Sequence, residues 1–528
     1  MKKNITLITL LIGLVSPILV NALDNSDDIL EELSDDLKTY SELATNIKQN
    51  VDYMPYIIST LDADELLSLG VLNLREALNL IPGVDLSVGI SGQLTPVFRG
   101  INAYTFGQSK LIIDGVSVND QLLGSYTQFL DIPIQLIHRI EVIRGSGSLL
   151  NDDNGYAGSI NIITKANRDD KSNVINQIFT AAGSDDYTLL GGIYSYHNEN
   201  IQINSDAFFQ KHNLELYAGV DKFGESGYTD HHLKNYQAGL TVNYNDFKLI
   251  SRFYNNQTGV NYSQSFTVSE DESDFYHIDN NYVALLYKNL IFPGIELDFS
   301  LNYYDENRVV QNKVIPDGKN KLPNGRYFIT DFKEKTYTQR LEFKLTELER
   351  SKISFGILSK QSRVDRNMSG KSQDNLQTFE YKEILEIDKI NGYSIYLDNL
   401  FNYSEALSLQ LGLKYHSYDG MESQLTPRFA TVYRYKDDNI FKLIYSHAFR
   451  QPSWREQYVQ NQSFYRSNPD LEVETVDSFE FSYIKKWEID NYFKFNAFQI
   501  NNHEQIHAQN EQHTFLNSDD NHLYGAEV

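Results

Sequence analysis

One stretch of the sequence matches a known catalytic pattern in both residue types and spacing, His503-Glu504-Gln505-Ile506-His507. Two histidines four residues apart can hold zinc, and the glutamate between them can activate a zinc-bound water for hydrolysis. That chemistry requires a helix, which turns both histidines to one face. The strand-like segment Phe493–Ile500 and an Asn- and Gln-rich stretch flank the motif, so we expect a strand and a loop here.

Other candidate binding residues lie near this motif. His513, together with His503 and His507, is a candidate for binding a metal or haem, although we expect no resident metal. An aromatic cluster precedes the motif and is formed by Trp454, Tyr458, Phe464 and Tyr465. Such side chains can stack on a ferric siderophore, and they can equally anchor a protein at a membrane interface.

The composition of the chain excludes several classes of function. The 528 residues include 46 basic and 71 acidic side chains, which gives a net charge of 46 − 71 = −25. We therefore expect no nucleic-acid partner, because phosphate binding depends on clustered lysine and arginine. The absence of cysteine excludes disulfides, thiolate catalysis and Cys-ligated zinc.

The N-terminus predicts export. Lys2 and Lys3 precede an apolar run from Ile5 to Val20, and small residues follow at Val20-Asn21-Ala22. This order is typical of a Sec signal peptide, which we assign to residues 1–22. Residues 23–50 form an acidic leader, and no later stretch reaches the roughly 18 apolar residues of a transmembrane helix.

Residues 51–165 predict a small mixed α/β domain. Asn73 can cap a helix whose apolar positions recur every three or four residues, and Pro82-Gly83 ends that helix. Short apolar strands are expected at Lys110–Ile113, Arg139–Ile143 and Gly158–Lys165.

From about residue 172 the hydrophobic pattern has a period of two. In the segment 407–416, leucines and a tyrosine alternate with Ser408, Gln410, Gly412, Lys414 and His416. Repeated segments of this kind are typical of an outer-membrane β-barrel, with the apolar face toward lipid and the polar face toward the lumen. A soluble β-sandwich or propeller is the alternative. Polar insertions at 256–279, 306–334 and 362–389 suit outer loops, whereas the connections 245–246 and 291–294 suit short periplasmic turns.

Nine short motifs resemble those of TonB-dependent outer-membrane receptors and occur in that family's order. They are Leu74–Leu86, Phe98–Ile101, Leu111–Asp120, Ile137–Leu150, Gly158–Lys165, Leu425–Tyr433, Tyr445–Tyr458, Asn468–Phe479 and Leu523–Glu527. The resemblance implies a mainly β fold, in which a plug domain (51–165) fills an antiparallel transmembrane β-barrel (166–528) of 22 strands. It also implies a monomeric receptor in the outer membrane of a Gram-negative-type bacterium, embedded in outer-membrane lipid and driven by the TonB–ExbB–ExbD complex.

The same resemblance suggests roles for individual residues. We expect four charged plug residues to dock the plug on the barrel or to contact ligand, namely Arg99, Arg139, Glu141 and Arg144. A TonB box is expected just before the plug, at Ser41-Glu42-Leu43-Ala44-Thr45. Gly145 is expected to hold a turn that other residues resist.

The resemblance favours uptake of a scarce, large nutrient, most often a ferric siderophore, with no catalytic residue and no cofactor. Haem, cobalamin, another metal chelate or a carbohydrate are alternative cargoes, and an outer-membrane HExxH metallo-hydrolase is an alternative of another class. The pattern contains about fifteen strands and the start of a sixteenth, so a 22-stranded barrel needs roughly 150 further residues. From the sequence we therefore expect a truncated receptor, and a non-functional one is the remaining alternative.

Overall fold

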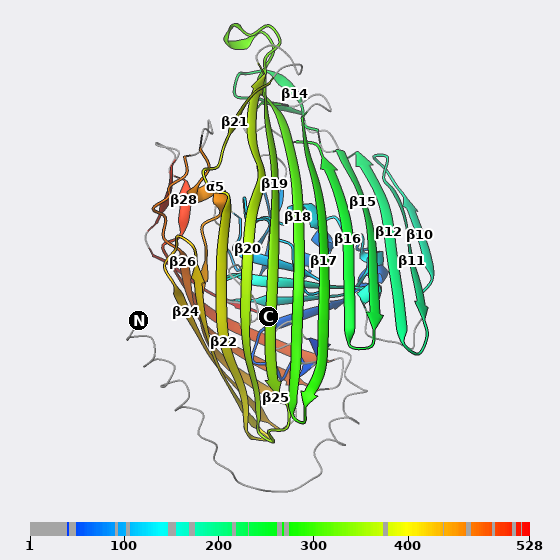
Figure 1. The fold of residues 1–528 in the computed structure, drawn as a ribbon, viewed down its shortest axis with the longest axis vertical. Coiled ribbons are helices and arrows are strands. Elements are labelled where there is room, and N and C mark those ends of the chain that lie inside the picture. Colours follow the sequence, from blue (N-terminus) through cyan, green and yellow to red (C-terminus); the bar gives the residue numbers. More distant parts are fainter. Residues whose placement is uncertain are drawn as a thin grey trace. The chain divides into compact units, whose positions relative to one another are not determined.

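The structure is a computed structural model, drawn in Figure 1, in which long strands make up most of the described chain. It describes residues 40–41, 49–89, 93–101, 106–145, 155–167, 175–213, 218–230, 232–260, 267–268, 274–372, 379–436, 438–460, 466–487, 491–508, 514–518 and 520–528. The expected signal peptide and nearly all of the acidic leader lie outside these ranges.

The plug is built around a five-stranded sheet with the order β3-β8-β9-β6-β7, in which β6 and β9 run parallel. These strands are β3 (Ile58–Asp62), β6 (Ser109–Ile113), β7 (Val116–Ser117), β8 (Ile137–Arg144) and β9 (Gly158–Thr164). A separate hairpin consists of β4 (Val84–Val88) and β5 (Leu94–Phe98), and the short strands β1 (Tyr40–Ser41) and β2 (Gln49–Asn50) come before the plug in the sequence. The three strands expected from the sequence are β6, β8 and β9.

The plug has two short α-helices, α3 (Ala63–Ser68), which packs on β3 and β8, and α4 (Leu74–Leu78), which contacts β4 of the hairpin. The Asn73 side chain accepts a hydrogen bond from the backbone N–H of Glu76 at the start of α4, which confirms the expected cap. Further 3-10 turns are η1 (Thr127–Phe129), η2 (Ile134–Leu136), η3 (Lys165–Asn167) and η4 (Lys319–Lys321). None of the helices in the described part of the chain is long and apolar enough to cross a membrane.

The rest of the described chain forms one antiparallel sheet of seventeen strands. In order they are β10 (Gln177–Ala182), β11 (Thr188–His197), β12 (Ile201–Asn213), β15 (His232–Tyr244), β16 (Phe247–Thr258), β17 (Phe275–Phe292), β18 (Ile295–Ile315), β19 (Arg326–Leu345), β20 (Ser351–Ser372), β21 (Phe379–Glu383), β22 (Lys389–Ser404), β23 (Leu407–Tyr418), β24 (Gln424–Tyr435), β25 (Asn439–Arg450), β26 (Glu474–Lys486), β27 (Tyr492–His503) and β30 (Asn521–Glu527). Without the short β21, the sheet has fifteen strands and the seven-residue strand β30. This number agrees with the fifteen strands and the start of a sixteenth that the alternation predicts. Within the described residues, no pairing joins β10 to β30.

The large sheet buries its polar face and exposes its apolar face. On β23, Gln410, Lys414 and His416 are buried, whereas Leu411 is 60% exposed and Tyr415 is 38% exposed. A soluble sheet would bury the leucines instead. The inversion confirms the expected barrel wall, with apolar side chains toward lipid and polar side chains toward the plug.

The two ends of the sheet differ as expected, but the predicted loops were too wide. Turns 245–246 and 293–294 are short and lie at one end, which we take as periplasmic. At the other end β18 runs to Ile315 and β19 starts at Arg326, so the prediction of a loop over 306–334 was wrong. The other two predicted loops, 256–279 and 362–389, are shorter in the structure and cover 259–274 and 373–388. Strand β21 lies within the second of them. Strands that project beyond lipid are polar on both faces, and the alternation that marks a strand disappears there.

Candidate functional site

Two plug arginines and two barrel glutamates form a buried ion cluster, which we call the balanced cluster. Arg99 Nη1 lies 2.6 Å from Glu480 Oε2 on β26, and Arg99 Nε lies 2.8 Å from Glu527 Oε1 on β30. Arg144 Nη1 lies 2.8 Å from Glu527 Oε2. Two positive and two negative charges meet here away from water, so each carboxylate is paired, as buried charge requires.

Glycines let the barrel carboxylates reach the plug backbone. Gly145 has a φ of +85°, and a Cβ added there would lie 2.3 Å from Glu480 Oε1. Gly83 has a φ of +77°, and its added Cβ would lie 2.3 Å from Glu527 Oε1. Both positions favour glycine by backbone conformation and by space.

The structure separates the four charged plug residues named from the sequence. Arg99 and Arg144 contact the barrel wall as described above. Arg139 and Glu141 instead bond to each other along β8, with 2.7 Å between Arg139 Nη2 and Glu141 Oε1. Side chains two apart on a strand share a face, so this local pair satisfies both charges within the plug.

A second buried cluster, which we call the acidic cluster, joins the plug loop after β7 to β18 and β19. Arg308 Nη2 lies 2.6 Å from Asp120 Oδ2 and 2.8 Å from Glu306 Oε1. Glu334 accepts the backbone N–H groups of Gln121 at 2.8 Å and Leu122 at 3.1 Å. One arginine thus faces three carboxylates. Burial, reinforced by Glu306 and opposed by Arg308, raises the pKa of Asp120 to about 6.

Buried lysines hold the start of the plug at the periplasmic end. Lys442 Nζ on β25 donates to the carbonyl oxygens of Val51 at 3.0 Å and Tyr56 at 2.9 Å. Lys494 Nζ on β27 donates to the carbonyl of Ile58 at 3.1 Å. The plug is therefore fixed to the wall near its first residues as well as at the two ion clusters.

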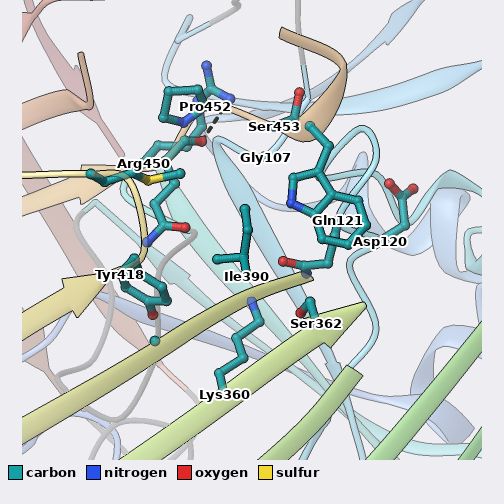
Figure 2. Close-up of a pocket in the computed structure, with 15 residues that line it drawn as sticks. Gly107, Asp120, Gln121, Lys360, Ser362, Ile390, Tyr418, Arg450, Pro452 and Ser453 are labelled. Atoms are coloured by element: carbon teal, nitrogen blue, oxygen red, sulfur yellow. Dashed lines mark hydrogen bonds between the residues drawn. The ribbon is translucent and has the colours of Figure 1, made fainter. Parts of the chain in front are cut away.

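A pocket opens between the plug and the wall at the outer end, and we call it the outer pocket. Its walls come from plug residues 107, 120, 121 and 124, from β20 and β22, and from the ends of β23 and β25. The space that admits a water-sized sphere is about 20 Å³, so the outer pocket is a small opening between plug and wall in this structure. Figure 2 shows Tyr418, Lys360 and Ser362 on the barrel side, and Asp120 across the pocket from Tyr418.

The outer pocket offers hydrogen-bond donors and an aromatic wall. Lys360 projects from β20 into it, and the buried Gln451 amide nitrogen has no hydrogen-bond partner within the described part of the chain. Arg450 also lines the pocket, but Glu456 and Glu474 neutralise it at 2.9 and 2.6 Å. Lysine and amide donors of this kind suit an anionic ligand.

The short helix α5 (Trp454–Gln457) links this pocket to the plug. Ser453 and Glu456 form a capping box at its start. The backbone N–H of Trp454 donates to the carbonyl of Gln121 at 3.1 Å. The Trp454 side chain, 2% exposed, packs on Phe332. Burial therefore fixes Trp454 in the pocket wall.

The other three residues of the predicted aromatic cluster are placed less fully. Tyr458, which directly follows α5, is half-buried beside the same apolar group that contains Trp454. Phe464 and Tyr465 lie outside the described residues.

The HExxH stretch is not helical. His503 ends β27, Glu504 has a φ of +54°, and His507 lies in β28 (Ile506–Ala508), which pairs with β29 (Phe515–Asn517). This confirms the expected strand and loop. His503 Nδ1 lies 2.9 Å from Asp520 Oδ1. In the described ranges no three histidine or acidic side chains are grouped to hold a metal ion, and His513 falls outside those ranges.

Sequence reasoning missed the partners of the plug arginines and the whole acidic cluster. Glu480 and Glu527 are 381 and 428 residues from Arg99, and nothing local marks them. The one feature of the sequence that could have indicated these partners was a glutamate on the polar face of a strand with alternating hydrophobicity. Residues 42–45 of the expected TonB box lie outside the described part of the chain, and only the backbone of Ser41 is described.

A mixed α/β domain held against the buried polar face of a large antiparallel sheet defines a plug-and-barrel outer-membrane receptor. The family model described as TonB-dependent Receptor Plug Domain matches residues 50–159, and the model described as TonB dependent receptor-like, beta-barrel matches residues 167–528. The chain belongs to the TonB-dependent receptor family, a family of receptors and transporters rather than enzymes.

Curated relatives are similar over part of the chain. A vitamin B12 transporter of Photobacterium profundum is 30% identical over 162 residues, which are 31% of this chain and 25% of the relative. A vitamin B12 transporter of Vibrio vulnificus is 26% identical over 236 residues, 37% of this chain and 38% of the relative. The matches thus span well under half the length of these relatives.

Solved structures share the fold over nearly the whole chain. The pyoverdine outer-membrane receptor of Pseudomonas aeruginosa aligns with a TM-score of 0.69 and 14% identity, covering 92% of this chain and 76% of that one. The siderophore receptor PirA of Acinetobacter baumannii aligns with a TM-score of 0.66 and 13% identity, covering 89% and 77%.

Proposed function

We propose that this chain is an outer-membrane receptor for TonB-dependent uptake, and that its cargo is an anionic ferric siderophore. The observation that carries the proposal is the outer pocket. The pocket is lined by Lys360, by the Gln451 amide nitrogen, which has no hydrogen-bond partner in the described part of the chain, and by Trp454. The plug loop 120–124 forms its floor. Ferric siderophores are usually anionic, and these donors complement them. The names of the structural neighbours agree with this cargo.

In this mechanism the protein performs no chemistry on its cargo. The signal peptide (1–22) directs Sec export, and the TonB box at Ser41–Thr45 engages the TonB–ExbB–ExbD complex. The outer membrane has no nucleotide energy source, so work must arrive by mechanical coupling. Ligand in the outer pocket touches the plug loop 120–124, which the acidic cluster and α5 hold to the wall.

Tryptophan fluorescence tests the pocket directly, because the chain has only two tryptophans. Trp454 lines the pocket, whereas Trp487 is 65% exposed after β26. In a Trp487→Phe background, ferric enterobactin or ferric pyoverdine should quench the remaining emission. Lys360→Gln should weaken that binding about tenfold, as loss of a charged hydrogen bond predicts. The matched control is Lys321→Gln, which removes an exposed charge in η4.

The possible outcomes separate the candidate cargoes. Quenching by cyanocobalamin alone would favour cobalamin, the second candidate, which the names of the curated relatives support. Quenching by none of the three probes contradicts the pocket assignment. A Trp454→Phe chain, which keeps Trp487, should show no response to any probe.

Uptake by whole cells tests the coupling separately. Leu43→Pro should abolish energised uptake of the bound probe and leave its binding unchanged, and Leu33→Pro in the leader serves as the control. Glu504→Gln should leave uptake intact. Loss of a hydrolytic activity in that variant would instead support the HExxH alternative.

A further inference from the structure

The first residues of the plug lie against the inner face of the wall at its periplasmic end. We call residues 51–58 the entry segment, because they follow the leader and lead into β3. Six of these eight residues are buried, and only the last belongs to a strand. Ile57, for example, packs on Ala430 and Ile444 of the wall. A buried segment without regular structure needs hydrogen-bond donors from elsewhere for its carbonyl groups.

Lysines on three neighbouring strands supply partners for the entry segment. Lys442 on β25 and Lys494 on β27 donate to three of its backbone carbonyl groups, at distances between 2.9 and 3.1 Å. Lys486 Nζ, at the end of β26, lies 2.6 Å from Asp52 Oδ2. We call these three lysines the basic cluster. Neutral carbonyl oxygens therefore hold two of the three ammonium groups, and a carboxylate holds the third.

Strand register places the basic cluster on one face of the wall. Lys442 pairs with Ser482 across β25 and β26, and Lys494 pairs with Ile484 across β26 and β27. Ser482, Ile484 and Lys486 are alternate residues of β26 and so share a face. Ser482 and Ile484 are fully buried under the plug. All three lysines therefore point into the lumen, close to its periplasmic mouth.

The carboxylate that offsets the basic cluster belongs to the entry segment itself. Lys442 is attracted by Asp52 and repelled by Lys486 and Lys494. Lys494 also lies near the balanced cluster, which acts on it with one charge of each sign. Removal of the entry segment would therefore take away Asp52 and the carbonyl acceptors together, and would leave three positive charges on a surface that was buried.

This arrangement is set up to bind an anion after the segment has left. In the uptake mechanism proposed above, the pull on the TonB box at residues 41–45 reaches the entry segment before the rest of the plug. Lysines without partners at a poorly hydrated surface attract carboxylate, phosphate or catecholate oxygens. We propose that the basic cluster is an anion-binding site, which the entry segment conceals at rest and which binds the anionic cargo at the periplasmic mouth during uptake. The inference rests on the proposed function for the pull and for the charge of the cargo.

Energised uptake of ferric enterobactin by whole cells tests the proposal, with surface binding measured on the same cells. Lys442→Gln with Lys494→Gln should slow uptake at saturating cargo about tenfold, as loss of charged hydrogen bonds predicts, and leave surface binding unchanged. Asp52→Asn is the matched control. It removes a contact of the entry segment but keeps every lysine of the wall, so uptake should be as fast as in the native chain.

The sign of the effect separates cargo binding from docking. If the lysines only dock the plug, their removal eases release of the entry segment, and uptake stays unchanged or becomes faster. Either of these results in the double variant would overturn the proposal. A native chain that neither binds nor takes up any of the three cargo probes would instead contradict the proposed function.

Single-molecule pulling tests the site in the purified full chain, even if the double variant fails to reach the membrane. The chain has no cysteine, so engineered cysteines in the leader and in the turn 245–246 provide two handles. Once the entry segment has been pulled free, ferric enterobactin should slow its return to the wall about tenfold. Lys442→Gln should lose most of this slowing, whereas the exposed control Lys321→Gln should keep it.

The remaining outcomes of the pulling experiment are equally decisive. A return rate that ferric enterobactin does not change in the native chain would overturn the site, as would equal slowing in Lys442→Gln. Slowing by inorganic pyrophosphate but not by ferric enterobactin would assign the site to a small periplasmic anion and overturn its role in cargo uptake.

Discussion

The balanced cluster and the acidic cluster both join the plug to the wall, yet they handle charge in opposite ways. At the balanced cluster, Arg99 and Arg144 meet Glu480 and Glu527, so charge cancels. At the acidic cluster one arginine faces three carboxylates, and neutral groups donate many of the remaining hydrogen bonds to these carboxylates. Glu306 Oε2, for example, accepts from Tyr304 at 2.8 Å and Asn280 at 2.9 Å.

The difference shows which attachment can respond to its surroundings. In a buried cluster whose charges are all paired, stability changes only when one partner is removed, because removal leaves an unpaired buried charge. A cluster with surplus negative charge responds to protons and to nearby charge. Asp120 belongs to this cluster and also lines the outer pocket, so the plug attachment that can respond lies beside the pocket.

The largest effect is expected from breaking the balanced cluster. Glu480→Gln leaves Arg99 short of a charged partner in a buried site and should destabilise the docked plug by about 3–5 kcal/mol. Urea unfolding in the Trp487→Phe background measures this, because Trp454 is hydrogen-bonded through its backbone to the plug loop. The control is Glu472→Gln, an exposed acid just before β26. An equal loss in both variants would contradict the cluster's role.

A smaller loss is expected from Gly145→Ala. The added Cβ would meet Glu480 Oε1 at 2.3 Å, and the φ of +85° is unfavourable for alanine. Backbone strain of this kind costs about 1–3 kcal/mol, and the displaced carboxylate adds to it. Gly224→Ala is the matched control, since its φ is +80° but no atom lies within 4 Å of the added Cβ. If the two variants lose the same stability in the same urea titration, the close approach to Glu480 contributes nothing.

The wall of the fold could be predicted because lipid outside and a polar plug inside impose strict alternation, as at Gln410 and Leu411. Strand ends could not, because Asp305 and Asn307 extend β18 above the lipid, where neither face is apolar. For the site, the charged plug residues were visible in the sequence. The sequence did not show which of them contact the barrel and which pair within the plug. Arg139 pairs with Glu141 two residues away, whereas the partner of Arg99 comes close only when the barrel strands have paired.

Glu334→Gln in the acidic cluster should change stability very little. The glutamine keeps one acceptor for the backbone N–H groups of Gln121 and Leu122 and loses the other, at about 0.5–1.5 kcal/mol. Removing one of three crowded negative charges offsets that loss, so the net change should stay within about 1 kcal/mol. The same urea titration applies. A loss as large as that of Glu480→Gln would show that the acidic cluster is as tightly paired as the balanced one.

The smallest expected effect is the pH dependence of stability that comes from Asp120. It distinguishes the acidic cluster from the balanced cluster while both stay intact. Burial raises the pKa of Asp120 from its ordinary value of 3.8 to about 6, so the folded chain binds a proton that the unfolded chain has released between these values. This group's contribution to stability is therefore largest below pH 3.8 and is lost as the pH rises through 6. Lowering the pH from 7.5 to 5 should stabilise the native chain relative to Asp120→Asn, which cannot titrate at this position. The stability difference between these two chains, followed by urea midpoints at each pH, should move in favour of the native chain. A difference that stays constant over this range would mean that Asp120 stays ionised beside Arg308 down to pH 5, and the contrast between the clusters would then lie in geometry rather than charge.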